Sequence, residues 1–385
     1  MKKIKKAFFT IFIFGISISF FIACSEDRDY KCEGHDSLPT TNFVSHEKAA
    51  SISDIVCNFI NKNDVPCVQI SIVDSLGEIW TKSFGNTDID RAVELSNANT
   101  FRVASITKSI VATVIFKLSE EGKLNLNDKI SKYFDVSERF DDINIYNLLN
   151  HSSGLRELYT YPNLLFVSAS NPAKIWNPYK LTDMVLNSIT MFDVNEKHEY
   201  CNSNYLLLGI IAEKASNKRF DVLLGEMLSE HNINNTFFAP IQKSNTLICG
   251  YDRQFFFDRE HYIHFPEYTS LASAAYCSGN IVSNSSDIAN FFHLLFNNKI
   301  LSEQSLDILK TRYSADSDNE HITSFCNGVI SFEFDDDDYF GHDGNIVGFE
   351  SIVLYSPKDK FTLTILINKS DKLIEEITEQ ILDVL

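Results

Sequence analysis

The sequence predicts an α+β fold in which both ends of the chain supply strands to one sheet and the middle supplies helices. Residues 67–84 alternate apolar and polar side chains with a period of two around a turn. Long apolar runs at helical spacing occupy the middle of the chain, between residues 106 and 211. Strand-like segments return after residue 328. This order is typical of a sheet closed by both chain ends around a helical insert.

The first 24 residues have the form of an export signal. Four lysines precede an apolar run over residues 7–23, which ends at Ala23-Cys24. The segment resembles a bacterial lipoprotein signal, in which Cys24 would become the lipidated first residue. An uncleaved membrane anchor is the alternative, although the run is barely long enough to span a bilayer. We therefore expect an exported protein, lipid-anchored in the cell envelope, in the periplasm or at the cell surface.

The segment after the leader is acidic, contains a glycine and a proline, and has no apolar period, which predicts a tether. One large domain follows it. The expected organisation is a leader over 1–24, a tether over 25–44 and a domain over 45–385, with a sheet subdomain from 45–95 and 320–385 and a helical subdomain over 96–319.

Composition limits the possible partners. The net charge is −18, and it becomes −22 if the four lysines of the leader are removed. A surface this acidic excludes nucleic acid as a partner and repels other anions. The eight cysteines include no Cys-x-x-Cys pair. Four of them lie in apolar contexts and are expected to be buried thiols rather than bridges: Cys57, Cys67, Cys277 and Cys326.

The first elements of the domain are a helix and a hairpin. Residues 49–60 carry apolar side chains at helical spacing. Residues 67–73 and 79–84 alternate as strands, and Ser75-Leu76-Gly77 between them predicts a turn.

Ser105 and Lys108 lie three residues apart at the start of an apolar helical run that stops at Gly122. At this spacing they share one face of the helix, with Ser105 in the first turn, where backbone N–H groups favour negative charge. A buried lysine of lowered pKa can activate a serine, so the pair suits acyl transfer. A helix-capping serine with a solvated lysine is the alternative. The same spacing recurs at Ser45 and Lys48, to which we assign no role.

Two further segments place polar side chains beside buried elements. Residues 150–155 predict a tight turn in which His151 is a structural histidine. Tyr200 and Asn202 precede a helix that is apolar nearly all round, so both could reach one cavity. A packed tyrosine and a capping asparagine are the alternative for that pair.

The end of the chain returns to strands. A helix after residue 283 is expected to begin at a cap formed by Ser286 or Asp287. Asp335 to Asp338 predict a solvated hairpin turn. His261 and His264 lack a third ligand nearby, so no metal site is expected, and nothing indicates a cofactor. The expected strands are 328–332, 339–345, 348–355 and 361–367, followed by a helix from Lys372.

Ordered motifs resemble the serine β-lactamase and penicillin-binding protein superfamily. Ser105-x-x-Lys108 is the first of three motifs that follow in the order of this superfamily. The other two, Tyr200-x-Asn202 and His342-x-Gly344, resemble the forms found in its class C branch. That branch includes D-alanyl-D-alanine carboxypeptidases, D-aminopeptidases and esterases. Residues 148–155 resemble "LLTHTSGL", residues 200–209 resemble "YSNxxYxLLG" and residues 341–349 resemble "GHxGxxxGF". The resemblance covers about residues 45 to 385 and implies a β-lactamase-like antiparallel sheet flanked by helices.

By this resemblance Ser105 is the acylated nucleophile, and Lys108, alone or with Tyr200, is its base. Asn202 would orient Lys108 and the substrate amide. Cys201 departs from the usual serine between Tyr200 and Asn202, which leaves the catalytic groups intact.

The third motif, His342-Asp343-Gly344, would contact the substrate. His342 stands where other branches have a lysine, and would hydrogen-bond the tyrosine or the substrate. Alternation along a strand would turn the side chain of Asp343 away from the site. The N–H groups of Ser105 and Asn345 would form the oxyanion hole, and Gly344 completes the motif.

These features predict an exported serine hydrolase that acts through an acyl-enzyme on a small-molecule or peptide-like substrate, an ester or an amide. One alternative is a β-lactamase that cleaves penicillins or cephalosporins. Another is a catalytically silent lipoprotein that binds a cell-wall ligand, against which the intact set of Ser105, Lys108, Tyr200 and Asn202 argues.

Overall fold

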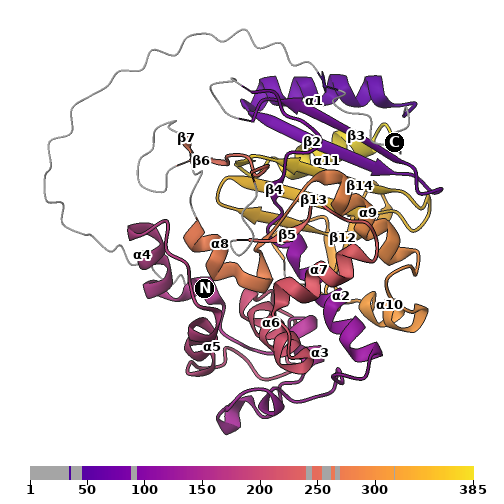
Figure 1. The fold of residues 1–385 in the computed structure, drawn as a ribbon. Coiled ribbons are helices and arrows are strands. Elements are labelled where there is room, and N and C mark those ends of the chain that lie inside the picture. Colours follow the sequence, from indigo (N-terminus) through magenta and orange to yellow (C-terminus); the bar gives the residue numbers. More distant parts are fainter. Residues whose placement is uncertain are drawn as a thin grey trace, which may run out of the picture. The chain divides into compact units, whose positions relative to one another are not determined.

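The computed structural model describes residues 34–35, 46–87, 93–239, 245–253, 262–264, 269–315 and 317–385 (Figure 1). Cys24 and the expected leader lie outside these residues, as does most of the expected tether. The strands are β1 (Gly34–His35), β2 (Cys67–Val73), β3 (Ile79–Gly85), β4 (Phe101–Arg102), β5 (Phe237–Phe238), β6 (Tyr251–Arg253), β7 (Tyr262–His264), β8 (Ile281–Ser283), β9 (Tyr313–Ser314), β10 (Ile322–Phe325), β11 (Ile330–Phe334), β12 (Asp337–Ile346), β13 (Phe349–Tyr355), β14 (Thr362–Ile367) and β15 (Lys369–Ser370).

The helices lie mostly between the two groups of long strands. The α-helices are α1 (Ala49–Asn63), α2 (Ile106–Glu120), α3 (Ile145–Leu149), α4 (Pro162–Ser170), α5 (Pro178–Leu186), α6 (Asn202–Ser216), α7 (Phe220–Ser229), α8 (Thr269–Ala275), α9 (Ser285–Phe296), α10 (Glu303–Leu309) and α11 (Ile374–Leu382). Short 3₁₀ helices are η1 (Ile130–Lys132), η2 (Glu138–Phe140), η3 (Leu158–Thr160) and η4 (Tyr276–Ser278). Within the described ranges, no helix is both long and apolar enough to span a membrane.

A nine-stranded antiparallel sheet organises the described part of the chain, in the order β1-β3-β2-β14-β13-β12-β11-β10-β9. The early hairpin of β2 and β3 joins the late strands through β14, where Ile365 lies opposite Ile70. The predicted sheet formed by both chain ends is therefore confirmed. The two-residue strand β1 pairs with β3 although it lies in the expected tether.

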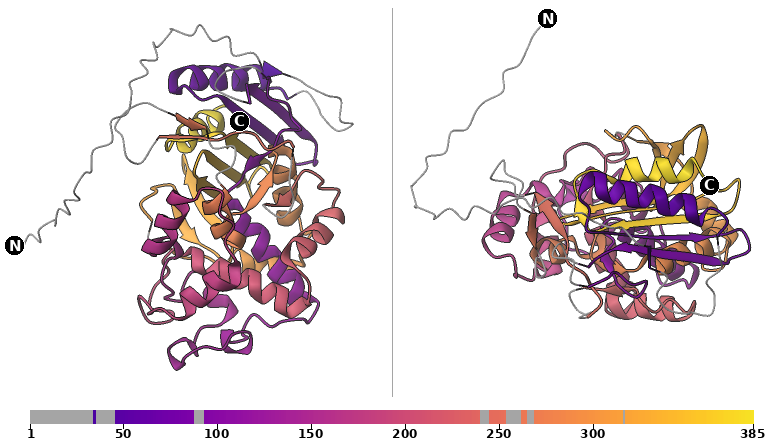
Figure 2. Two further views of the ribbon diagram at one scale, coloured as in Figure 1. Left: turned by 60° about the vertical axis from the view of Figure 1, so that its left-hand side comes forward. Right: turned by 90° about the horizontal axis from the view of Figure 1, so that it is seen from above.

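Helices cover both faces of this sheet. Helices α1 and α11 pack on each other and on the sheet, whereas α9 and the helical insert lie on the other side (Figures 1 and 2). Because both faces are covered, every residue of β2 is buried. Ser71 of β2 shows the contact with α9 directly, since its hydroxyl lies 2.7 Å from that of Ser285.

Helix ends deviate from the sequence predictions where a distant group forms the cap. The cap of α9 is Asn284, whose side chain accepts from the N–H of Asp287 at 2.9 Å, so the prediction of Ser286 or Asp287 is wrong. Helix α11 begins at Ile374, two residues later than expected. The carboxylate of Glu350, which is 1% exposed on β13, accepts the four backbone N–H groups of residues 371–374.

Turns and cysteines complete the comparison. The predicted hairpin turn between β11 and β12 is confirmed at Asp335 and Asp336, which have φ values of +49° and +65°. Asp337 and Asp338 belong to β12 and pair with β11, so the turn is two residues shorter than predicted. Cys67, Cys277 and Cys326 are buried thiols, as expected. Cys57 is disulfide-bonded, so the prediction of a buried thiol there is wrong.

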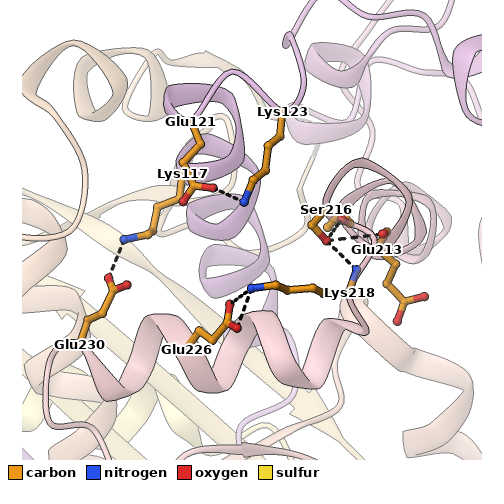
Figure 3. A network of polar contacts seen from close by, with 9 residues as sticks. Lys117, Glu121, Lys123, Glu213, Ser216, Lys218, Glu226 and Glu230 are labelled. Atoms are coloured by element: carbon orange, nitrogen blue, oxygen red, sulfur yellow. Dashed lines mark hydrogen bonds and ion pairs between the residues drawn. The ribbon is translucent and has the colours of Figure 1, made fainter.

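Helix α2 forms the centre of the insert and packs against α6, η4 and β12. Its apolar residues face all directions, and most of the helix is buried. Two ion pairs lie on the surface near α2 and α7 (Figure 3). Lys117 in the last turn of α2 lies 2.9 Å from Glu230, which follows α7, and Lys218, which precedes α7, lies 2.6 Å from Glu226. These exposed pairs contribute at most about 1 kcal/mol each, and the pocket between the helices has a volume of only about 50 Å³.

Candidate active site

Ser105 lies at the junction between β4 and α2. The residue before it, Ala104, has a φ of +45°, a left-handed conformation that non-glycine residues rarely adopt. Ser105 precedes the first helical residue, but its side chain makes no capping hydrogen bond. Its hydroxyl instead lies 2.9 Å from Nζ of Lys108, which is fully buried. The alternative of a capping serine with a solvated lysine is therefore wrong.

In its protonated form, Lys108 donates to three oxygens. Its Nζ lies 2.9 Å from Ser105 Oγ, 2.8 Å from Asn202 Oδ1 and 2.7 Å from the carbonyl oxygen of Ser278. Burial lowers the pKa of Lys108 to about 7, although nearby negative groups oppose the change. A substantial fraction of the amine is consequently neutral near pH 7, as a general base requires.

Tyr200 lies on the other side of Ser105. Burial raises the pKa of its phenol well above the usual value, and a hydrogen bond with Ser105 only partly offsets this. The ring also stacks near Lys108, whose Nζ is 4.7 Å from the ring centroid. Lys108 can therefore accept a proton near neutrality, whereas Tyr200 stays protonated and can donate a hydrogen bond.

Asn202 is held by a residue that the sequence interpretation missed. The carboxylate of Glu157 accepts the backbone N–H of Asn202 at 2.6 Å and its side-chain Nδ2 at 2.9 Å. Asn202 is the first residue of α6 and does not cap the helix, so the alternative of a capping asparagine is wrong. Glu157 stands two residues after Leu155, and only its place next to the Leu148–Leu155 motif could have drawn attention to it.

His151 supports Tyr200 from behind. Its Nδ1 accepts the backbone N–H of Cys201 at 3.1 Å and Nδ2 of Asn204 at 3.2 Å, and its ring centroid lies 4.7 Å from that of Tyr200. Burial keeps the pKa of His151 well below its usual value, so the ring is neutral. The expected structural histidine is confirmed. Cys201 is buried, and burial raises the pKa of its thiol, so it is not a nucleophile.

The third motif lies on β12, beside Tyr200. His342 is 2% exposed and does not line the cavity; its Nδ1 donates to the carbonyl oxygen of Asp343 at 2.6 Å. Its ring packs edge-on against Tyr200, with centroids 6.2 Å apart. Asp343 lines the cavity, and its carboxylate lies 3.6 Å from His342 Nδ1. The expectation that Asp343 turns away from the site is therefore wrong.

Gly344 brings β12 against the nucleophile loop. A Cβ atom at Gly344 would lie 2.6 Å from the carbonyl oxygen of Val103, 2.6 Å from Ser351 Oγ and 3.0 Å from Cβ of Ala104. Ser351 Oγ donates to the same carbonyl of Val103 at 2.9 Å. Only glycine permits this approach, which fixes the distance between Ser105 and the strand that carries Asn345.

A cavity of about 600 Å³ opens at Ser105. Ser105, Tyr200, Asn202, Gly344 and Asn345 line it. The N–H of Ser105 donates to no acceptor in the part of the chain that the structure describes, so it is available to an oxyanion. The other lining residues are Ala104, Tyr159, Leu271, Ala275, Ser278, Gly279, Ser317, Asp318, Asn319, Ile322, Phe325, Ile330, Asp343, Ile346 and Val347.

The described residues that line the cavity carry charges of one sign. Asp318 and Asp343 are carboxylates, and no lysine, arginine or histidine is among the described residues that line the cavity. Lys108 lies buried beneath Ser105. Across the described ranges, no group of three or more His, Cys, Asp and Glu side chains is placed to hold a metal ion. The site therefore combines a serine in contact with a buried lysine, a backbone N–H at that serine and two carboxylates among the described lining residues.

Known proteins are similar to this chain in sequence. Residues 52–385 match the family described as Beta-lactamase. Protein flp of Staphylococcus aureus (strain NCTC 8325 / PS 47) is 24% identical over 355 residues, which cover 88% of this chain and 68% of that protein. Penicillin-binding protein 4* of Bacillus subtilis (strain 168) is 26% identical over 237 residues, 59% of this chain and 51% of that protein.

Solved structures are similar in fold. The D-amino acid amidase from Ochrobactrum anthropi SV3, complexed with L-phenylalanine amide, aligns with a TM-score of 0.79 at 21% identity, covering 88% of this chain and 98% of that one. The octameric penicillin-binding protein homologue from Pyrococcus abyssi aligns with a TM-score of 0.77 at 22% identity, covering 87% and 76%. At these identities the likeness concerns the fold, which is the expected β-lactamase-like sheet flanked by helices.

Proposed function

The chain belongs to the Beta-lactamase family, within the serine β-lactamase and penicillin-binding protein superfamily, and on this basis we propose that it hydrolyses small esters or peptide-like amides through a Ser105 acyl-enzyme. The observation that carries the proposal is the contact of 2.9 Å between Ser105 Oγ and a buried lysine whose pKa is lowered to about 7. A lysine in this state can accept the serine proton at neutral pH.

In the first half of the reaction, Ser105 Oγ attacks the substrate carbonyl while its proton passes to Lys108. The carbonyl oxygen becomes an oxyanion that the N–H groups of Ser105 and Asn345 would bind. When the tetrahedral intermediate collapses, the bond to the leaving group breaks and the proton passes to the departing alcohol or amine, directly or through Tyr200. In the second half, water attacks the ester of Ser105, and the acid is released as the serine regains its proton.

The acidic wall of the cavity bears on the substrate class. A carboxylate-bearing substrate would meet Asp318 and Asp343 with no basic side chain among the described lining residues to pair with it. A neutral ester avoids this repulsion, and an amide with a free ammonium group gains attraction. The D-amino acid amidase of similar fold is consistent with a peptide-like amide as one substrate type.

Two other functions remain as competing proposals. A β-lactamase would have to bind an anionic ring system in this acidic cavity. A silent binding protein would have no use for the Lys108 geometry, because a ligand can be bound without a neutral lysine at the serine. We also propose, from the sequence alone, that the protein is exported and held to a membrane by a lipid on Cys24.

The test is a fluorophosphonate probe, which labels activated serines, followed by peptide mass analysis and assays with a p-nitrophenyl ester. Ser105→Ala should abolish labelling and hydrolysis, whereas Ser45→Ala, at the other Ser-x-x-Lys sequence, should leave both unchanged. Labelling at a residue other than Ser105, or equal activity in the two variants, would reject the assignment.

A further inference from the structure

Among Ser105, Lys108, Tyr200 and Asn202, Glu157 hydrogen-bonds Asn202. It precedes η3, and its carboxylate receives three N–H groups: the backbone N–H of Asn202 at 2.6 Å, Nδ2 of Asn202 at 2.9 Å and the backbone N–H of Tyr159 at 3.1 Å. Both carboxylate oxygens are thus in use. The carboxylate also lies at the N-terminal end of the fifteen-residue helix α6, where a negative charge is favoured.

These hydrogen bonds fix the positions of the oxygen and the nitrogen of the Asn202 side-chain amide. With Nδ2 directed at the carboxylate, Oδ1 is directed at Nζ of Lys108, 2.8 Å away. A flipped amide would place Oδ1 against the carboxylate of Glu157 and Nδ2 against the lysine. The contact between the two oxygens would be repulsive, so Glu157 holds the amide in one orientation.

The orientation matters for the neutral lysine. A neutral amine has two N–H donors and one lone pair. The fixed acceptors, Asn202 Oδ1 and the carbonyl oxygen of Ser278, take the two donors. The lone pair is then left for the third neighbour, Ser105 Oγ, at 2.9 Å. If the Asn202 amide flipped, its Nδ2 would compete with the serine proton for that lone pair.

We propose that Glu157 is a positioning residue of the acyl-transfer site: it orients Asn202 so that the lone pair of Lys108 faces Ser105, and its negative charge favours the protonated form of that lysine. The inference deepens the proposed hydrolase function and rests on it. Glu157 touches neither the reacting atoms nor Ser105, and acts through Asn202 and through its charge.

The charge around Lys108 supports the second half of the proposal. Burial lowers the pKa of Lys108, and Glu157 is the strongest of the groups that raise it, ahead of Asp343 and Cys201. Removing the charge of Glu157 should therefore lower the pKa of Lys108 further. The titratable groups that face Lys108 are Glu157, Asp343, Cys201, His151, Tyr200 and Tyr205.

The test is a pH profile of kcat/KM for a p-nitrophenyl ester with wild type, Glu157→Asp and Glu157→Gln. The acidic limb should reflect protonation of Lys108. Its midpoint should fall by about one pH unit in Glu157→Gln and by less in Glu157→Asp, which keeps the charge but withdraws it. The plateau of Glu157→Gln should fall between about 10- and 100-fold, because the amide loses its fixed orientation.

Glu199→Gln is the matched control, because Glu199 is an exposed carboxylate that pairs with Lys197 on the same segment as Tyr200. It should leave the midpoint unchanged. Coincident midpoints for wild type, Glu157→Asp and Glu157→Gln would overturn the proposal and leave Glu157 as a support of α6 alone. Glu157→Asp keeps the comparison possible if Glu157→Gln does not fold.

A measurement that needs no activity separates this proposal from the proposed function. The Lys108 amine can be titrated by NMR in protein with ¹³Cε-labelled lysine, with Lys108→Arg to assign the signal. A lower Lys108 pKa in Glu157→Gln supports the inference even if the fluorophosphonate probe fails to label Ser105, which would reject the hydrolase. Labelling of Ser105 with an unchanged Lys108 pKa would reject only the inference.

Discussion

Replacing Gly344 by alanine tests whether the contact between β12 and the nucleophile loop sets the geometry of catalysis. The added Cβ would lie 2.6 Å from Val103 O and from Ser351 Oγ, whereas ordinary contact begins at 3.4 Å. Each of these two distances must therefore increase by about 0.8 Å to reach an ordinary van der Waals contact. Neither atom is a flexible chain end: one is backbone, and the other donates a hydrogen bond to it.

The displacement should act more on catalysis than on stability. A misplacement near 1 Å costs about 10²-fold in rate, so kcat/KM for a p-nitrophenyl ester should fall by that order. Overpacking costs about 1–3 kcal/mol, so the free energy of unfolding measured in urea should fall by no more than this. The labelling rate of Ser105 by a fluorophosphonate should fall in parallel with kcat/KM.

Gly225→Ala is the control for Gly344→Ala, because a Cβ atom at Gly225 in α7 would meet no atom within 4 Å. It should keep full activity and gain stability from the better helix propensity of alanine, about 1 kcal/mol. Wild-type kcat/KM in a folded Gly344→Ala protein would refute the reasoning, since the strand could then move without disturbing the oxyanion hole.

Four further outcomes are expected. Lys108→Ala, Tyr200→Phe and the double variant should show losses in acylation rate that are far from additive, because both residues serve the proton of Ser105; strictly additive free energies would indicate separate roles. A chromogenic cephalosporin should be cleaved with a kcat/KM about tenfold or more below that of a short-chain p-nitrophenyl ester or a D-amino-acid anilide, because Asp318 and Asp343 repel its carboxylate; a preference for the cephalosporin would promote the β-lactamase alternative. Cys24→Ala should lose lipid labelling and membrane association in expressing cells, and a full-length cytoplasmic wild-type product would reject export. Glu350→Ala should lower the free energy of unfolding in urea by about 3 kcal/mol, because four backbone N–H groups of residues 371–374 lose their acceptor; an unchanged value would show that water replaces the carboxylate.

Periodicity was sufficient to predict the long elements. Strands β2, β3, β13 and β14 lie where the apolar alternation places them, and α2 runs from Ile106 to Glu120 as its apolar run predicts. These elements follow from local side-chain patterns, which the sequence displays directly. Helix caps do not follow from such local patterns. At the start of α9, Asn284, Ser286 and Asp287 are all suitable capping residues, and backbone geometry determines that Asn284 forms the cap.

Some site residues could be predicted from the sequence motifs and others could not. Motif order predicted which residues meet at Ser105, and the structure brings Lys108, Tyr200 and Asn202 to it. The motifs could not reveal Glu157, whose role depends on a contact with Asn202 across 45 residues of chain. They also could not predict that Asp343 lines the cavity and that His342 is buried edge-on against Tyr200, because simple strand alternation gave the opposite expectation.

The order of strands in the large sheet has a consequence for how the chain folds during synthesis. The hairpin of β2 and β3 contacts the late strands through β14, which lies almost 300 residues further along the chain. Until Thr362–Ile367 has left the ribosome, β2 presents an unpaired apolar edge. Such a distant partner raises the contact order and slows folding. A chain whose synthesis stops before β14 would therefore keep an unpaired strand edge to which strands of other chains can pair. Such a chain would aggregate instead of forming a stable native-like state.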